Sequence, residues 1–258
     1  MNKEHDTVKQ HYDRFPQQYA HIEGDTNSSL DCKTFTYFLS CWEPTMPIVD
    51  VGCGTGRVGR RVATVLDPKE LVFMDLSNNS IKQARSIDEA QSQNHTTNSL
   101  YIQGDLLHPP LADLQYCVCH GVAHHTPEPI QALQNLFLML APGGFLYLTV
   151  YGKSWYERTY KGARWLRWCR NQNHEWLVNG FYALYYPLRT IMRYIETREL
   201  SLDDNLRARF EDFLMTPYAA FFSEKTLLEL FQLNGMEVLM QETLNLGVLH
   251  SFVLKKTR

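Results

Sequence analysis

The fold is decided by the stretch Ile48-Val49-Asp50-Val51-Gly52-Cys53-Gly54-Thr55-Gly56. Residues 47–51 form a short apolar run, rich in β-branched residues and closed by turn residues, which predicts a buried strand. The three alternating glycines allow a tight turn and bring backbone N–H groups close to a ligand. Residues 57–66 follow with valines at helical spacing, so we expect a helix whose positive dipole end faces that ligand.

The spacing of these glycines indicates which ligand binds. A dinucleotide fingerprint, G-x-G-x-x-G, would place its third glycine where Arg57 stands, which disfavours a nicotinamide dehydrogenase. The pattern Asp-x-G-x-G-x-G instead resembles motif I of the class I S-adenosylmethionine (SAM)-dependent methyltransferases. The resemblance implies SAM as the cofactor and S-adenosylhomocysteine as its product.

An aspartate ends the second predicted strand, residues 71–74. Asp75 lies about 20 positions past the glycine-rich loop, the spacing at which an acidic residue meets an adenosine ribose. Its carboxylate can accept hydrogen bonds from both ribose hydroxyls. Capping of the next helix is the alternative, but Ser77 and Asn78 already suit that role.

A second aspartate ends the third predicted strand, residues 100–103. The resemblance implies that Asp105 binds the exocyclic amine of adenine and that Leu106 lies beside the ring. A Gly-Asp pair after a strand is also an ordinary turn, so a purely structural role stays open.

The block HGVAHHTPEP, residues 120–129, follows a fourth predicted strand at 114–119. Thr126 and Pro127 predict the N-cap and first turn of a helix. Methyltransferases of the ubiquinone/menaquinone-biosynthesis type carry a similar H-H-x-x-x-P block, which implies that the backbone near His120 and Gly121 faces the methionine end of SAM. His124 and His125 are candidates for a general base, and packing within the loop is the alternative. The cofactor-binding residues expected from the whole resemblance are Tyr19, Asp50, Gly52, Cys53, Gly54, Gly56, Asp75, Leu76, Asp105, Leu106, His120 and Gly121.

The two regions outside this core are less defined by the resemblance. Residues 7–20 predict a helix interrupted by Pro16, and its segment from Tyr12-Asp13 to Tyr19 resembles one that covers the cofactor in such enzymes. Packing of its aromatic face on the core is the alternative.

Residues 153–198 carry nine basic and three acidic side chains among eleven aromatic ones. Arg164, Arg167 and Arg170 should share one helix face. We consider a helical lid with a solvated basic face, a site for an anionic or aromatic substrate, and a nucleic-acid or membrane surface. The candidate substrate contacts are Tyr12, Tyr151, Tyr156, Arg164 and Tyr182.

Length and composition bound the remaining expectations. A chain of 258 residues with 44% hydrophobic content can bury a large core, and its net charge of −3 argues against a globally basic nucleic-acid binder. The sequence shows no secretory signal, no run long enough for a membrane span and no C-x-x-C spacing, so we expect a cytoplasmic protein with reduced thiols and no metal site. Nothing in it specifies an oligomeric state.

The predicted fold is a Rossmann-like α/β domain of the class I methyltransferase type. It has a seven-stranded, mostly parallel sheet with helices on both faces, an antiparallel last strand and a helical insertion after strand 5. We expect a single domain, divided into a helical cover (1–40), a SAM-binding core (41–151), a helical lid or substrate insertion (152–222) and a closing helix with two strands (223–258).

The function implied by the resemblance is methyl transfer from SAM to an O, N or C atom of a small molecule. A tRNA-modifying methyltransferase would explain the basic aromatic insertion. A non-catalytic SAM-binding protein would keep the three aspartates but lack a substrate pocket. Both alternatives stay open.

Overall fold

The computed structural model describes residues 3–14, 30–91, 97–197, 207 and 210–257. The chain divides into two compact units. We call residues 1–154 with 218–258 the sheet unit and residues 155–217 the helical unit. The helical unit falls within the insertion expected at 152–222.

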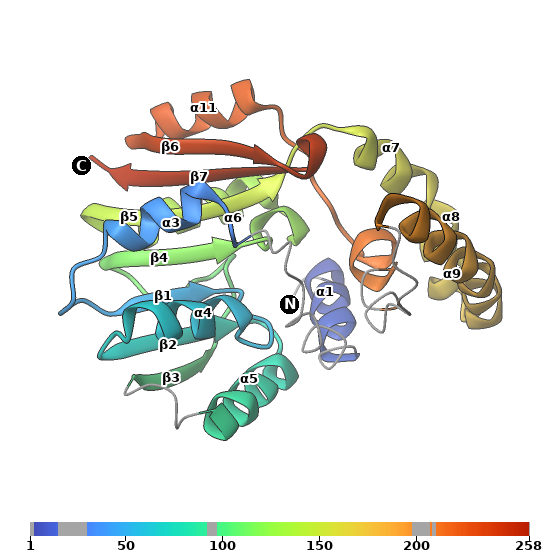
Figure 1. The fold of residues 1–258 in the computed structure, drawn as a ribbon, viewed down its shortest axis with the longest axis horizontal. Helices are drawn as coiled ribbons and strands as arrows, with labels where there is room; N and C mark the ends of the chain where they lie inside the picture. The colour runs from blue at the N-terminus through green and yellow to red at the C-terminus, as the bar shows by residue number, and fades with distance from the viewer. Residues whose placement is uncertain (1–2, 15–29, 92–96, 198–206, 208–209, 258) are drawn as a thin grey trace. The chain divides into compact units, whose positions relative to one another are not determined.

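The sheet unit is built on a central β-sheet (Figure 1). Its strands in the described residues are β1 (Ile48–Val51), β2 (Glu70–Asp75), β3 (Asn98–Gln103), β4 (Leu114–His120), β5 (Leu140–Tyr151), β6 (Met236–Leu244) and β7 (Leu249–Lys256). These seven strands have the order β3-β2-β1-β4-β5-β7-β6. Strands β1 to β5 are parallel, and β7 is antiparallel to both of its neighbours. The predicted sheet, with its antiparallel last strand, is confirmed.

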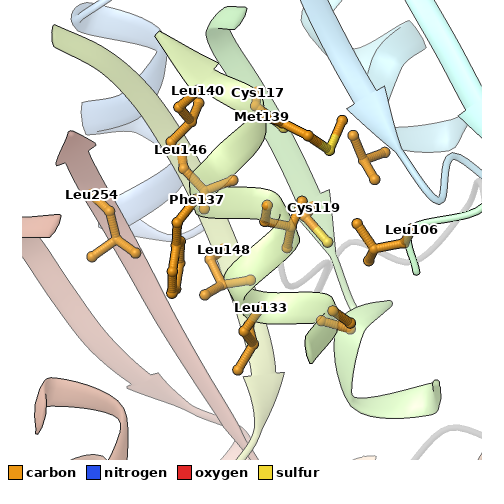
Figure 2. Packing of buried hydrophobic residues seen from close by; sticks show 14 of the residues in the cluster. Leu106, Cys117, Cys119, Leu133, Phe137, Met139, Leu140, Leu146, Leu148 and Leu254 are labelled. Carbon is orange, nitrogen blue, oxygen red and sulfur yellow. The ribbon is translucent and has the colours of Figure 1, made fainter. Parts of the chain in front are cut away.

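Helices cover both faces of this sheet. The described helices of the sheet unit are α1 (Lys3–Arg14), α3 (Lys33–Ser40), α4 (Arg57–Leu66), α5 (Asn78–Gln91), η3 (Ala123–His125), α6 (Pro129–Met139), α11 (Glu224–Leu233) and η5 (Asn245–Gly247). On one face α6 and α11 bury leucines and phenylalanines against β4, β5 and β7, as Figure 2 shows for Leu133 and Phe137. On the other face α3 and α4 bury Phe35, Phe38 and Val62 against β1, β2 and β5.

Helix α4 begins and ends where its sequence predicts. Val58, Val62 and Ala63 are buried and return at the spacing of one helical face, while Arg61 is exposed. The last helix is also as expected, because Ser223 caps α11 by accepting a hydrogen bond from the Thr226 N–H and Asn234 ends it.

Three predicted boundaries are wrong, and prolines account for two of them. Helix α6 begins at Pro129, and Thr126 instead ends η3, because residues before Pro127 and Pro129 are pushed out of the helical region. From Ala141-Pro142-Gly143-Gly144 we expect a turn that precedes the fifth strand, but β5 already begins at Leu140. These four residues are an irregularity within the strand, where Pro142 has no N–H for the ladder. Helix α1 begins at Lys3 rather than residue 7 and ends at Arg14, and residues 15–29 lie outside the described residues.

The helical unit consists of α7 (Trp155–Gly162), α8 (Arg164–Asn171), α9 (Glu175–Thr197) and the π-helical turn η4 (Glu211–Met215). Its own core contains Leu166, Val178 and Phe210. Beside this core the carboxylate of Glu211, which is fully buried, accepts two hydrogen bonds from Arg170 and lies 2.8 Å from the guanidinium of Arg207.

The arginines of α8 do not share one solvated face. Arg170 pairs with Glu211, and Arg167 donates to the carbonyls of Leu214 and Tyr160 with its guanidinium over the Tyr160 ring. Only Arg164 of the three is exposed. The interpretation of this trio as a solvated basic face is therefore wrong for two of its members.

Candidate functional site

The predicted site residues meet at one edge of the sheet. In the strand order β3-β2-β1-β4, the carboxyl ends of four adjacent parallel strands lie side by side. Asp105 follows β3, Asp75 ends β2, the glycine-rich loop follows β1 and His120 ends β4. The chain order reverses between β1 and β4, and ligands of open α/β sheets bind at such a switch point.

The glycine-rich loop is fixed at its start and open at its centre. Gly52 has a φ of +72°, and a Cβ there would lie 2.4 Å from the side chain of Val122, so only glycine fits between the loops after β1 and β4. The Met74 carbonyl accepts hydrogen bonds from the N–H groups of Gly52 and Cys53 at 2.7 and 3.0 Å. Gly54 has a φ of +55°, and a Cβ there would meet nothing within 4 Å. A ligand at the switch point can therefore approach the backbone of the loop at Gly54.

Asp75 joins the end of β2 to this loop. Its Oδ2 accepts from the Gly54 N–H and its Oδ1 from the Ser77 N–H, both at 2.8 Å. Burial raises the pKa of Asp75 to about 6 in spite of these hydrogen bonds. Ser77 is the cap of α5, because its Oγ accepts from the Ser80 N–H. Asp75 is therefore not needed as the helix cap, and its ribose role stays a prediction.

Asp50 lies deeper in the site. It is 2% exposed, and its Oδ2 accepts from the Gly59 N–H in the first turn of α4 at 2.8 Å. Burial raises the pKa of this carboxyl group to about 7. Asp50 therefore links β1 to α4. Cys53 is buried in the same loop. Gly56 is the N-cap of α4 and has a left-handed backbone conformation.

Asp105 forms a turn after β3. Its Oδ1 accepts from the Leu107 N–H at 2.8 Å, and its Oδ2 lies 2.9 Å from His108 Nδ1. Leu106 is buried in the core cluster of the α6 face. The sequence left two roles for Asp105, a structural turn and an adenine contact. The turn is confirmed, and the adenine contact stays a prediction. Leu76 precedes α5, and its carbonyl accepts from the Gln103 side chain.

The loop after β4 brings a neutral imidazole to the same edge. His120 Nδ1 lies 3.2 Å from Thr149 Oγ1, and its ring stacks on Tyr147. Burial, assisted by the positive charge of Arg57, lowers the pKa of His120 to about 3. Gly121 has a φ of +75° and open space on its Cβ side.

An aromatic cluster follows on η3 and at the end of β5. The ring of His124 lies 3.9 Å from that of Tyr151 and 4.2 Å from that of His125, measured between ring centroids. His124 is fully buried, and neither of its ring nitrogens has a hydrogen-bond partner among the described residues. Its pKa is lowered well below the usual value, by burial and then by the neighbouring histidines. His125 Nδ1 lies 2.9 Å from the Tyr218 carbonyl oxygen, which can only accept, so this nitrogen carries the proton.

The N-terminal helix contacts the site through a residue that the sequence did not single out as a ligand. The carboxylate of Asp13 accepts from Ser77 Oγ at 2.5 Å, and its carbonyl accepts from the Asn79 side chain. Helix α1 is thereby attached at the start of α5, next to Asp75. Tyr12 packs edge-to-face against His11. Tyr19 lies outside the described residues.

Two of the predicted substrate contacts, Tyr156 and Tyr182, pack against other residues of the helical unit. Tyr156 is fully buried, and its hydroxyl donates to the Phe213 carbonyl at 2.6 Å. Tyr182 packs on Phe210, with the guanidinium of Arg207 over its ring. Their substrate roles stay predictions.

The segment that forms this edge matches a known family. Residues 49–146 match the family described as "Methyltransferase domain". The chain as a whole has the Rossmann-like fold of class I SAM-dependent methyltransferases, as its sheet and its structural neighbours show.

Three similar proteins illustrate the range of this methyltransferase domain. An "O-methyltransferase" of Pyrenophora dematioidea is 31% identical over 40% of this chain and 38% of its own length. The ubiquinone/menaquinone biosynthesis C-methyltransferase UbiE of Ectopseudomonas mendocina (strain ymp) is 27% identical over 47% of this chain and 48% of its own. A chain of the complex between the Haloferax volcanii Trm112 methyltransferase activator and a methyltransferase aligns with a TM-score of 0.61 and 15% identity, covering 97% of this chain and 98% of that one. The chain spans less than half the length of the two curated relatives.

The described residues lack two features that bear on the site. They contain no group of three or more His, Cys, Asp or Glu side chains that could hold a metal ion. Among the helices they form, none combines the length and apolar character needed to cross a bilayer. All six cysteines lie within them as free thiols.

Proposed function

We propose that the protein is a SAM-dependent methyltransferase that acts on a small-molecule acceptor. The observation that carries the proposal is the meeting of the glycine-rich loop, Asp75, Asp105 and His120 on four adjacent strand ends of a methyltransferase domain. The O-, N- or C-character of the acceptor atom is left open, since the relatives include both O- and C-methyltransferases.

The residues at this edge fit SAM. Gly54 and Gly121 have open space on the side where another residue would carry a Cβ, so a ligand can approach the backbone of both loops. Asp75 provides carboxylate oxygens for ribose hydroxyls, and Asp105 an acceptor for the adenine amine. Bound SAM would supply an electrophilic methyl group on a sulfonium. The neutral state of His120 at pH 7 adds no positive charge next to that cation.

The aromatic cluster of His124, His125 and Tyr151 is the proposed acceptor side. Because the pKa of His124 is strongly lowered, its ring stays neutral, but the ring is fully buried, so its one accepting nitrogen reaches an O–H or N–H of the acceptor only if the cluster opens. His125 donates through Nδ1 to the Tyr218 carbonyl, which leaves Nε2 as the better candidate for accepting a proton. Alignment of this kind contributes up to about 7–11 kcal/mol in favourable cases.

Transfer from labelled SAM tests the proposal. The protein is incubated with methyl-labelled SAM and either a small-metabolite extract or total tRNA. We expect label in a small molecule, a reduction of about 10²–10⁴-fold in His125→Gln if this ring is the base, and unchanged transfer in Asp67→Asn at the far end of α4. Label in tRNA would favour the tRNA-modifying alternative. Binding of SAM without transfer to either pool would favour the non-catalytic one.

The cytoplasmic location and the single-domain arrangement expected from the sequence stay predictions. They are consistent with a methyltransferase acting on a metabolite.

A further inference from the structure

The helical unit exposes an apolar surface that the proposed function does not use. Six large side chains on α8 and α9 are between 48% and 76% exposed. They form what we call the tryptophan–leucine face, which consists of Trp165, Trp168, Trp176, Leu184, Leu188 and Ile191. Contiguous exposed apolar surface of this kind marks an interaction site.

The face is continuous by helical geometry. On α9, Leu184, Leu188 and Ile191 recur at steps of four and three residues, and Trp176 lies two turns before Leu184 on the side away from the buried Val178. Pro187 lies inside the helix between the two leucines. On α8, Trp165 and Trp168 are three residues apart, while Leu166 points into the core. The two helices join where the Trp165 ring meets Phe181 of α9 edge-to-face, with centroids 5.6 Å apart.

The charges around the face are basic. Arg158, Lys161 and Arg164 are exposed on α7 and α8. Residues 153–198 have nine basic against three acidic side chains. Of the nine, Arg167 and Arg170 are bound inside the helical unit and Lys161 pairs with Glu157. Helices that lie in a membrane interface are typically rich in tryptophans and apolar residues on one face, with cationic side chains beside that face.

We propose that the tryptophan–leucine face docks on an anionic lipid surface. Residues 176–188 contain no charged side chain, and their exposed side chains are large and apolar. Such a stretch suits the acyl region of a lipid surface better than a nucleic acid, whose binding is dominated by phosphate contacts. A symmetric contact with a second copy would bring the same cations together, which disfavours that partner. The described helices cannot span a bilayer, so the association is peripheral.

Vesicle sedimentation and intrinsic fluorescence test this proposal on the full chain. Four of the five tryptophans lie between residues 155 and 176, so their emission reports directly on the helical unit. We expect co-sedimentation with vesicles of phosphatidylcholine and phosphatidylserine at low salt, with a blue shift of the emission. Binding to phosphatidylcholine alone should be weaker, and salt should reduce the difference.

Matched variants locate the contact. The double variant Leu184→Glu/Leu188→Glu should reduce vesicle partitioning more than about tenfold, since two exposed leucines that would enter the lipid are replaced by charged side chains. Arg158→Gln should reduce it about fivefold, and only for anionic vesicles. Leu233→Glu, at an 84% exposed leucine of α11 in the sheet unit, should have no effect. Circular dichroism and S-adenosylhomocysteine binding check the fold of each variant independently of the lipid result.

Three results would overturn the proposal. The first is that the wild-type chain does not sediment with anionic vesicles at low salt. The second is that the Leu184→Glu/Leu188→Glu variant sediments as well as the wild type. The third is that vesicles do not bind, while the variant abolishes self-association or RNA binding of the wild type. Failure of methyl transfer with intact vesicle binding would contradict only the proposed function.

Discussion

Two buried carboxylates hold the glycine-rich loop in place. Asp75 binds its centre through the Gly54 N–H, and Asp50 binds the helix that follows it through the Gly59 N–H. Both groups have a raised pKa because burial penalises their charged form. The loop is therefore held by hydrogen bonds to carboxyl groups whose charged form is disfavoured by burial.

Asp50 gives a pH-dependent stability that can be isolated by one substitution. Its pKa is raised from 3.8 to about 7 in the folded chain. Between these pH values Asp50 is protonated in the folded chain and ionised in the unfolded chain. Its contribution to the free energy of unfolding is therefore fully present below about pH 4 and is lost as the pH rises through 7. Asp50→Asn removes this dependence. Urea unfolding should show that the stability of the variant relative to the wild type increases between pH 4 and pH 7.5. A difference that is constant with pH would contradict this account.

Among the site residues, those with a local signal could be predicted. The glycines, Asp75, Asp105 and the histidine pair lie next to strand ends that the sequence shows. The contact of Asp13 with Ser77 joins residues 64 positions apart and has no local signal. The ring partners of His124 likewise depend on how β5 ends beside η3.

At the scale of single elements, caps determine where helices begin. Ser223 accepts the Thr226 N–H at 3.2 Å at the start of α11. Ser223→Ala should lower the free energy of unfolding by about 1 kcal/mol, because that N–H loses its partner. Ser40→Ala, at the end of α3 where the hydroxyl donates to the Tyr37 carbonyl, should change it by less than about 0.5 kcal/mol. Equal effects of the two variants in urea unfolding would contradict the capping role.

The helical unit depends on one buried ion cluster. Glu211 is fully buried against Arg170 and Arg207. Glu211→Ala removes the buried carboxylate that pairs with Arg170 and Arg207 and should destabilise the unit by about 3–5 kcal/mol. Limited proteolysis should then cleave within residues 155–217 before the sheet unit.

The exposed pair of Glu157 and Lys161 provides the control. Glu157→Ala should change stability by at most about 1 kcal/mol, because solvent screens this pair. Faster cleavage in Glu157→Ala than in Glu211→Ala would show that the buried cluster is not what stabilises the helical unit.

The elements show why some boundaries could not be predicted. A Thr-Pro pair is a good helix start, but the second proline at 129 is a better one and displaces it. The spacing of Arg164, Arg167 and Arg170 indicated one face of a helix, yet not that Glu211, from a distant segment, would bind one of them. Periodicity identifies the elements, and their partners depend on the tertiary structure.

At the scale of the whole molecule, the fold was accessible from sequence because its units repeat. The sequence predicts strands alternating with helices, which favours a parallel sheet, although the described residues between β3 and β4 form no helix. The antiparallel last strand is implied by the family resemblance, and the short closing connection suits it. The strand order β3-β2-β1-β4 places the loop after β1 between the ends of β2 and β4. The division into a sheet unit and a helical unit is marked only by the change to basic and aromatic residues near 153.

Calorimetric titration with S-adenosylhomocysteine, SAM and NADH tests whether the carboxyl edge of the sheet binds a sulfur-bearing nucleoside. We expect heat of binding for the first two ligands and none for NADH. We also expect affinity for S-adenosylhomocysteine about 10- to 100-fold lower in Asp75→Ala and unchanged in Asp67→Asn, since charged hydrogen bonds to the ribose are lost only in the former. Tight binding of NADH with no heat from either sulfur nucleoside would contradict this expectation.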